Sequence, residues 1–165
     1  ATTVSAIDDL CHDDDVEVSV SRVAGMPFVG SDMRIDPWQT FDVAREHRVT
    51  HVRGRLRDGV VETDPVLLPL PVAVLDQRFT LVLNGARVRM RFDDDGNATG
   101  LIGGGVSVED FLATFAMFGG FPESLRGTVA ATLRLFTDLD RNAMGRCERF
   151  SAALEVSARP TFLNP

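Results

Sequence analysis

The sequence has no lysine and no tyrosine, and it contains only one tryptophan and two cysteines. All 17 basic residues are therefore arginine, and the 24 acidic residues give a net charge of −7. The arginine bias most simply reflects a GC-rich coding sequence, so it carries little mechanistic information. Because the net charge is negative, the general electrostatic attraction that drives nucleic-acid binding is missing. We therefore expect no nucleic-acid partner.

Long apolar runs are also missing, since no stretch of about 18 or more apolar residues occurs, and we expect no transmembrane segment. The chain opens at Ala1, with no initiator methionine and no basic region followed by an apolar one. This opening favours a chain from which a signal peptide has been removed. The expected location is outside the cytoplasm, in the periplasm, at the cell surface or in the extracellular space.

The composition is that of a folded protein, with 165 residues, 44% apolar and 25% charged. A chain of this size can bury a core without a metal. It shows no repeat, low-complexity tract or linker. We predict a single β-rich domain over residues 1–165, with an acidic N-terminal segment over residues 1–15.

The two cysteines, Cys11 and Cys147, stand near opposite ends of the chain. Because domain termini are often close in space, we predict a disulfide between them, which would tie down the N-terminal segment and require an oxidising compartment. Two unconnected thiols, or a metal ligand formed by Cys11 beside His12, remain as alternatives. Cys11 is a poor candidate for a nucleophile because flanking aspartates oppose thiolate formation. These are Asp8, Asp9, Asp13, Asp14 and Asp15.

Alternation of apolar and polar residues predicts several strands. Val16, Val18 and Val20 give the first strand, and residues 50–57 give another that ends at an Asp58-Gly59 turn, with a face of arginines that must be solvated or paired. Prolines at positions 65, 69 and 71 indicate that the next segment is an edge strand or an extended crossing. Residues 30–46 fit either a short helix or a strand.

The stretch from Phe79 to Phe92 is apolar at odd positions before Asn84-Gly85 and at even positions after it. Asn-Gly is a preferred pair for a type I′ turn, so we predict a tight antiparallel hairpin here. A second turn at Asp95-Gly96 would begin a third strand of the same meander.

Helical spacing follows the strands. Ser107, with Asp110 three residues later, is typical of a helix start, and Gly119-Gly120 would end that helix. A second helix begins at Pro122 as a first helical residue and places Leu125, Val129, Leu133 and Phe136 on one face. Alternation from Phe150 to Ala158 predicts a final strand. The expected fold is mainly β, an antiparallel sandwich or open barrel, with two consecutive helices before the last strand.

Three groups of residues are weak metal candidates. Asp93, Asp95 and Asn97 alternate as in a calcium loop, and so do Asp138, Asp140 and Asn142, but alanine stands where an EF-hand requires glycine. His47 and His51 are four residues apart and would share one face of a helix or strand. These residues form either ordinary turns and surface positions or irregular metal sites. We expect no cofactor, with calcium as the alternative.

An apolar ligand pocket is a further candidate. Phe111, Phe115, Met117 and Phe118 recur at helical spacing, so they either pack in the core or line a pocket for a small apolar molecule or lipid.

The tail from Asp138 to Ala158 resembles the ends of secreted bacterial lipoproteins of unassigned function, which implies export and no catalytic residue. The sequence shows no nucleophile with a base, no complete metal site and no cofactor motif. We therefore predict an exported structural or interaction module that is not an enzyme, as one subunit of a cell-surface or periplasmic assembly with other proteins. The alternatives are a carrier of a small apolar ligand, a calcium- or transition-metal-binding protein, and an enzyme whose catalytic residues are scattered over the β-scaffold and leave no local motif.

Overall fold

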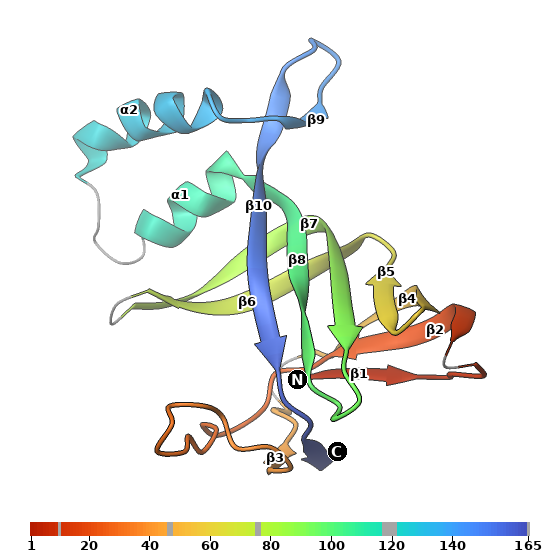
Figure 1. Cartoon of the computed structure of the whole chain (residues 1–165). Coiled ribbons are helices and arrows are strands. Elements are labelled where there is room, and N and C mark those ends of the chain that lie inside the picture. Colours follow the sequence, from red (N-terminus) through yellow and green to blue (C-terminus); the bar gives the residue numbers. More distant parts are fainter. Residues whose placement is uncertain (10, 46–47, 75–76, 117–121, 165) are drawn as a thin grey trace. The chain divides into compact units, whose positions relative to one another are not determined.

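The computed structural model describes residues 1–9, 11–45, 48–74, 77–116 and 122–164 (Figure 1). The strands are β1 (Thr2–Ser5), β2 (His12–Val20), β3 (Thr40–Asp42), β4 (Thr50–Arg57), β5 (Val60–Thr63), β6 (Val66–Val74), β7 (Gln77–Phe92), β8 (Ala98–Ser107), β9 (Leu139–Arg141), β10 (Cys147–Ala158) and β11 (Phe162–Asn164). The helices are α1 (Val108–Ala116) and α2 (Glu123–Arg134).

Most strands belong to one sheet with the order β1-β2-β4-β5-β7-β8-β10-β9, and β6 also pairs with β7. Each strand pair with a defined register in this sheet is antiparallel, whereas β11 pairs with β3 in parallel. Within the described residues the path ends at β1 and β9, so the sheet is not closed into a barrel. The predicted fold class, mainly β with two consecutive helices, is confirmed, although three strands rather than one follow the helices.

The chain forms two compact units. The first contains residues 1–64, 88–102 and 155–165, and the second contains residues 65–87 and 103–154. Strands β7, β8 and β10 each contribute residues to both units.

The core of the first unit comes from alternating residues of β2, β4 and β5. Val16 and Val18 are fully buried, and Leu56 and Val61 are nearly so. Burying such a side chain stabilises the fold by about 1.5–3 kcal/mol. The predicted strand over Val16–Val20 is confirmed. The Asp58-Gly59 turn between β4 and β5 is also confirmed, and both its residues have positive φ, as a type I′ turn requires.

The hairpin predicted at Asn84-Gly85 is wrong, because β7 runs through these residues without a turn. Its partner is β6, where Val66 pairs with Ala86 but Leu68 pairs with Leu83. Two steps along β6 thus match three steps along β7, which is a β-bulge, and Gly85 supplies the positive φ of +59°.

The bulge accounts for the change of parity in the sequence. In a regular strand Leu83 and Ala86 would face opposite sides of the sheet. The extra residue at the bulge returns them to one side, and both are buried. The same pattern therefore fits a hairpin or a bulge, and only the presence of β6 as a partner selects the bulge.

Strand β6 carries Pro69 and Pro71, which lie opposite Val82 and Thr80 of β7. Within the described part of the chain β6 pairs with no other strand, so it is the edge strand that the prolines predict. The second predicted turn is confirmed as well, because the N–H of Asp93 bonds to the carbonyl of Asn97 between β7 and β8.

The two helices lie in the second unit. The hydroxyl of Ser107 accepts the N–H of Asp110 at 3.2 Å, so this serine caps α1 as predicted. The prediction made Pro122 the first helical residue, whereas it is the residue directly before α2. Val108 and Leu112 pack against Ala130, with Val129 and Leu133 beside them. No helix among the described residues is long and apolar enough to cross a membrane.

The outer ends of the predicted apolar face of α2 are not covered. Leu125 and Phe136 are exposed, whereas Val129 and Leu133, between them, pack against the helical core. The segment over residues 30–46, as far as it is described, forms no helix and only the short strand β3.

The predicted disulfide is not formed, since Cys11 and Cys147 are both free thiols. The prediction treated Cys147 as lying at the C-terminal end of the fold. Instead it is the first residue of β10, which is 12 residues long and carries the chain roughly 36 Å further before it ends. Cys147 pairs with Arg141 of β9, whereas Cys11 lies just before β2, near the other end of the strand order.

Candidate functional site

The first predicted calcium loop is a hydrogen-bonded turn. One carboxylate oxygen of Asp93 accepts the N–H groups of Asp95 and Asn97, at 3.1 and 2.8 Å, and the other accepts the Asn97 side chain at 2.9 Å. These bonds, above all that from the Asn97 side chain, lower the pKa of Asp93. The Asn97 oxygen accepts from Arg159 at 2.8 Å. Of the oxygen atoms proposed as ligands, those of Asp93 and Asn97 therefore already serve the turn or its contact with Arg159.

The second predicted loop is also used internally. Asp138 accepts the hydroxyl and the N–H of Ser151, both at 2.7 Å, and these two bonds lower its pKa. Asp140 pairs with Arg149. The side-chain oxygen of Asn142 accepts the N–H groups of Met144 and Arg146. The Asn142 bonds close the turn between β9 and β10, and the carboxylates of Asp138 and Asp140 face donors of β10.

The histidine pair is only partly described, because His47 lies outside the described residues. His51, on β4, is bonded through Nδ1 to Glu17 at 2.8 Å and to Ser19 at 3.0 Å. Across the residues that the structure describes, no group of three His, Cys, Asp or Glu side chains could hold a metal ion.

The apolar pocket can be followed only through Phe111, because Met117 and Phe118 lie outside the described residues, as does the side chain of Phe115. Phe111 packs edge-on against Phe150, with ring centroids 5.6 Å apart. It borders a cavity of only about 10 Å³, shared with Phe79 and Leu81, which is room for about one water molecule. The geometry around Phe111 is that of core packing.

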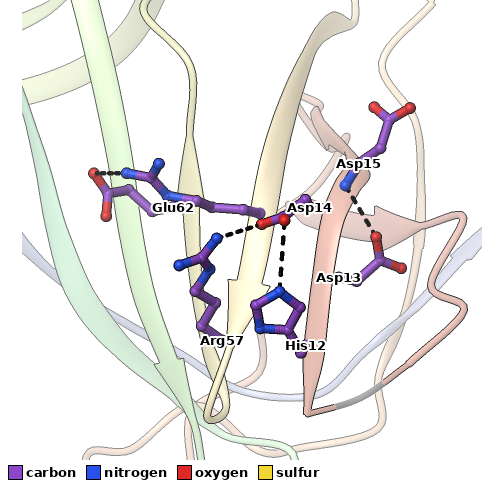
Figure 2. Close-up of polar contacts among 7 residues, drawn as sticks. His12, Asp13, Asp14, Asp15, Arg57 and Glu62 are labelled. Carbon is purple, nitrogen blue, oxygen red and sulfur yellow. Dashed lines mark hydrogen bonds and ion pairs between the residues drawn. The ribbon is translucent and has the colours of Figure 1, made fainter.

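The arginine face of β4 is paired with acidic residues of β2. Arg57 bonds Asp14 at 2.7 Å, and Arg53 bonds both oxygens of Asp15 at 2.9 and 3.0 Å. Figure 2 shows Asp14 held by both Arg57 and His12. The hydrogen bond from Arg57 lowers the pKa of Asp14. The predicted N-terminal acidic segment is thus partly a strand with ionic partners.

A bulge in β2 allows this pairing. The register shifts between Asp13 and Val16, so β2 contains an extra residue relative to β4. Consecutive residues of a regular strand face opposite sides, yet Asp14 and Asp15 both reach arginines of one face. Both pairs are exposed to solvent, which screens their attraction, so they order this face more than they stabilise the fold.

A depression of about 460 Å³ lies on the same face, over β4, β5 and β7. Arg55, Arg57, Arg89 and Arg91 line it, with Asp58, Val60 and Glu62 among them. Arg55 pairs with Glu62 at 3.3 Å. This arginine-lined depression gathers positive charge on a chain whose net charge is −7.

A second exposed surface is formed by residues 26–38, which we call the apolar loop. Its large apolar side chains are largely exposed: Phe28 by 77%, Met33 by 84% and Trp38 by 59%. The others are Met26, Val29 and Ile35, and Phe162 of β11 is exposed beside Trp38, with ring centroids 5.8 Å apart.

The apolar loop is held by the side chain of Gln39. Its oxygen accepts the N–H of Phe28 at 2.7 Å, and its nitrogen donates to the carbonyls of Phe28 and Asp36 at 3.0 and 2.6 Å. The N–H of Trp38 bonds to the carbonyl of Pro160 at 2.7 Å. These bonds fix both ends of the loop, so its apolar side chains are presented by an ordered backbone.

Comparisons with protein-family models, with characterised proteins and with solved structures found no match to this chain. The candidate sites therefore depend on geometry and chemistry alone.

Sequence reasoning identified neither surface. Most of the apolar loop lies in residues 30–46, which fit either a short helix or a strand, so the sequence does not decide which of its side chains are exposed. The available signal was the high apolar content of residues 26–38. The arginines of β4 were recognised, but their position beside those of β7 follows from strand order.

Proposed function

We propose that the protein is a non-enzymatic interaction module that binds another protein through the apolar loop. The observation that carries this proposal is the exposure of six large apolar side chains on a short segment with a fixed backbone. Contiguous exposed apolar surface marks interaction sites in folded proteins. Aromatic side chains and methionine are also enriched in protein interfaces.

Binding through this loop loses little conformational entropy. Gln39 and the bond from Trp38 to Pro160 already fix the backbone. Ordering costs on association are therefore confined to side chains. Trp38 is the expected anchor, because tryptophan is one of the residue types enriched among those that dominate binding energy.

The charge around the loop favours a protein over a membrane as partner. Asp32 and Asp36 outnumber Arg34 within the loop, and the chain as a whole is acidic, so an anionic lipid surface would repel it. We infer a partner with an apolar groove bordered by basic side chains.

Export and membership of a cell-surface or periplasmic assembly are part of the proposal. With both cysteines free, export is supported by the sequence features alone. The carrier and metal-binding alternatives are less well supported. The cavity beside Phe111 is too small for a ligand, and Asp93, Asp138 and Asp140 are engaged by protein groups.

The test is photo-cross-linking in cells of the source organism. A photoreactive amino acid replaces Phe28 or Trp38 in turn, and Phe136 in the control, since Phe136 is also an exposed aromatic side chain but lies outside the loop. We expect one protein to be cross-linked from positions 28 and 38 and not from 136.

That protein is then purified, and its affinity for the chain is measured. Trp38→Ser should weaken binding at least about tenfold, whereas Phe136→Ser should leave it unchanged. Three outcomes contradict the proposal: equal labelling from all three positions, no binding by the purified partner, or binding of the loop to vesicles of neutral or anionic lipid instead.

A further inference from the structure

The arginine-lined depression has two rungs of side chains on one face of the sheet. In one rung Arg55 lies opposite Glu62, and Glu62 lies opposite Arg89. In the next, Arg57 lies opposite Val60, and Val60 lies opposite Arg91. Directly opposed residues of antiparallel strands share a face, so the four guanidinium groups surround the shorter Val60 and Glu62 side chains. Val60 therefore forms part of the floor of a hollow bordered by arginines.

The positive charge of this hollow is compensated on the β4 and β5 side, where the carboxylates of Asp58 and Glu62 also line it. Arg57 is paired with Asp14 of β2, and Arg55 with Glu62 of β5. Among the described residues, Arg91 donates only to the carbonyl of Asp58, at a long 3.5 Å. Arg89 makes no ion pair with a carboxylate in the parts of the chain that the structure describes, although it lies across from Glu62. The β7 side of the depression therefore carries excess positive charge.

The spacing of these charges limits what could balance them. Arg89 and Arg91 are two residues apart on one strand, so their Cα atoms are separated by about 7 Å. Arg57 of β4 and Arg91 of β7 lie on either side of Val60, with β5 between their strands. Their Cα atoms are therefore roughly 10 Å apart. Side chains from these positions can converge on one compact anion above Val60. Guanidinium groups also bind tetrahedral oxyanions in a bidentate way.

We propose that this depression binds a small molecule bearing phosphate or sulfate groups. The volume of about 460 Å³ is within the range of small-molecule sites. A long polyanion is excluded as the ligand because Asp14, Asp15 and Glu17 lie along the adjoining strand and would repel it. This site is separate in its residues and chemistry from the apolar loop, so it can fail without affecting the proposed protein interaction.

The experiment measures binding of pyrophosphate, and separately of inorganic sulfate, to the full chain by isothermal titration calorimetry. Arg89 and Arg91 are replaced together by alanine, as R89A/R91A. The control is R78A, which removes an exposed arginine from the same strand but outside the depression. R53A is a second control, because Arg53 pairs with Asp15 and does not line the depression.

We expect pyrophosphate to bind saturably, with one site per chain. Its affinity should be at least about tenfold weaker in R89A/R91A, and in both controls within about twofold of that of the unchanged chain. Circular dichroism checks that each variant folds. If the double variant does not fold, the test is repeated with R89A alone, because Arg89 is exposed. The proposal is overturned if neither pyrophosphate nor sulfate binds, or if R78A and R53A weaken binding as much as R89A/R91A, since that would indicate general charge attraction only.

Discussion

Thr63, at the end of β5, is a polar side chain that is only 1% exposed. Its hydroxyl accepts the N–H of Val88 at 3.0 Å. Glu62 and Arg89 are the last paired residues of β5 and β7. The Thr63 hydroxyl therefore bonds the next N–H of β7, just beyond the end of this backbone pairing. A buried N–H without a partner is costly, which gives this single side chain a larger role than its size suggests.

Thr63→Val keeps the shape of the side chain and removes the acceptor. We expect the free energy of unfolding to fall by about 1–3 kcal/mol, because the N–H of Val88 is left buried without this bond. Urea unfolding at neutral pH measures the change. Thr99→Val on β8, an exposed position, is the matched control and should change stability by less than about 0.5 kcal/mol. Equal effects of the two substitutions would refute this role of the hydroxyl.

Asp93 makes the stability of the β7–β8 turn depend on pH. Its folded-state pKa lies below the usual 3.8, first because of the bond from the Asn97 side chain. The charged carboxylate therefore stabilises the folded state above pH 3.8, and this contribution is lost as the pH falls through the lower folded-state pKa.

Asp93→Ala should accordingly destabilise the protein more at about pH 7 than at about pH 2–3. The measurement is the difference in urea midpoint between the unchanged chain and the variant at each pH. Asp94→Ala is the control, because Asp94 makes none of the hydrogen bonds that close the turn. A pH-independent difference for Asp93→Ala would show that the carboxylate charge is not what holds the turn.

At the scale of the elements, the bulge in β7 is set by Gly85. Its φ of +59° lies in the left-handed region, and a Cβ at this position would meet no atom within 4 Å. Space is therefore not the constraint, and backbone conformation is. A Cβ added to Gly127, inside α2, would also meet no atom within 4 Å, but the φ of Gly127 is not positive. The same substitution at these two glycines separates conformational strain from packing.

Gly85→Ala should lower the free energy of unfolding by roughly 1–2 kcal/mol, the cost of a left-handed residue with a Cβ. Gly127→Ala should raise it by about 0.5–1 kcal/mol, because alanine restricts the unfolded chain and favours the helix. Thermal or urea unfolding reports both. A stabilising Gly85→Ala would mean that β7 does not need the left-handed bulge.

At the scale of the whole molecule, the two compact units can be observed separately. The only tryptophan, Trp38, is in the first unit, and both described helices are in the second. Tryptophan fluorescence therefore follows one unit, and the helical circular dichroism signal follows the other.

Because β7, β8 and β10 run through both units, we expect them to unfold together. Urea transitions followed by fluorescence and by circular dichroism should have the same midpoint, as in two-state unfolding of a single domain. Variants with Leu112→Ala in the helical core should shift both midpoints equally. Two separate transitions would contradict the prediction of one domain over residues 1–165.

The sequence by itself determined features governed by neighbouring residues. The period of two at Val16 and Val18, the Asp58-Gly59 turn and the Ser107 cap each depend on a few adjacent positions, and each is present as expected. Only the tertiary structure decided whether Asn84-Gly85 turns or bulges, since that depends on β6 being available as a partner. It also decided that Cys147 starts a long strand rather than lying at the chain end, and that the arginines of β4 and β7 share one face. The physical reason is that strand order, and with it the partner of each strand, is set by contacts between residues far apart in the chain, on which local periodicity and turn chemistry carry no information.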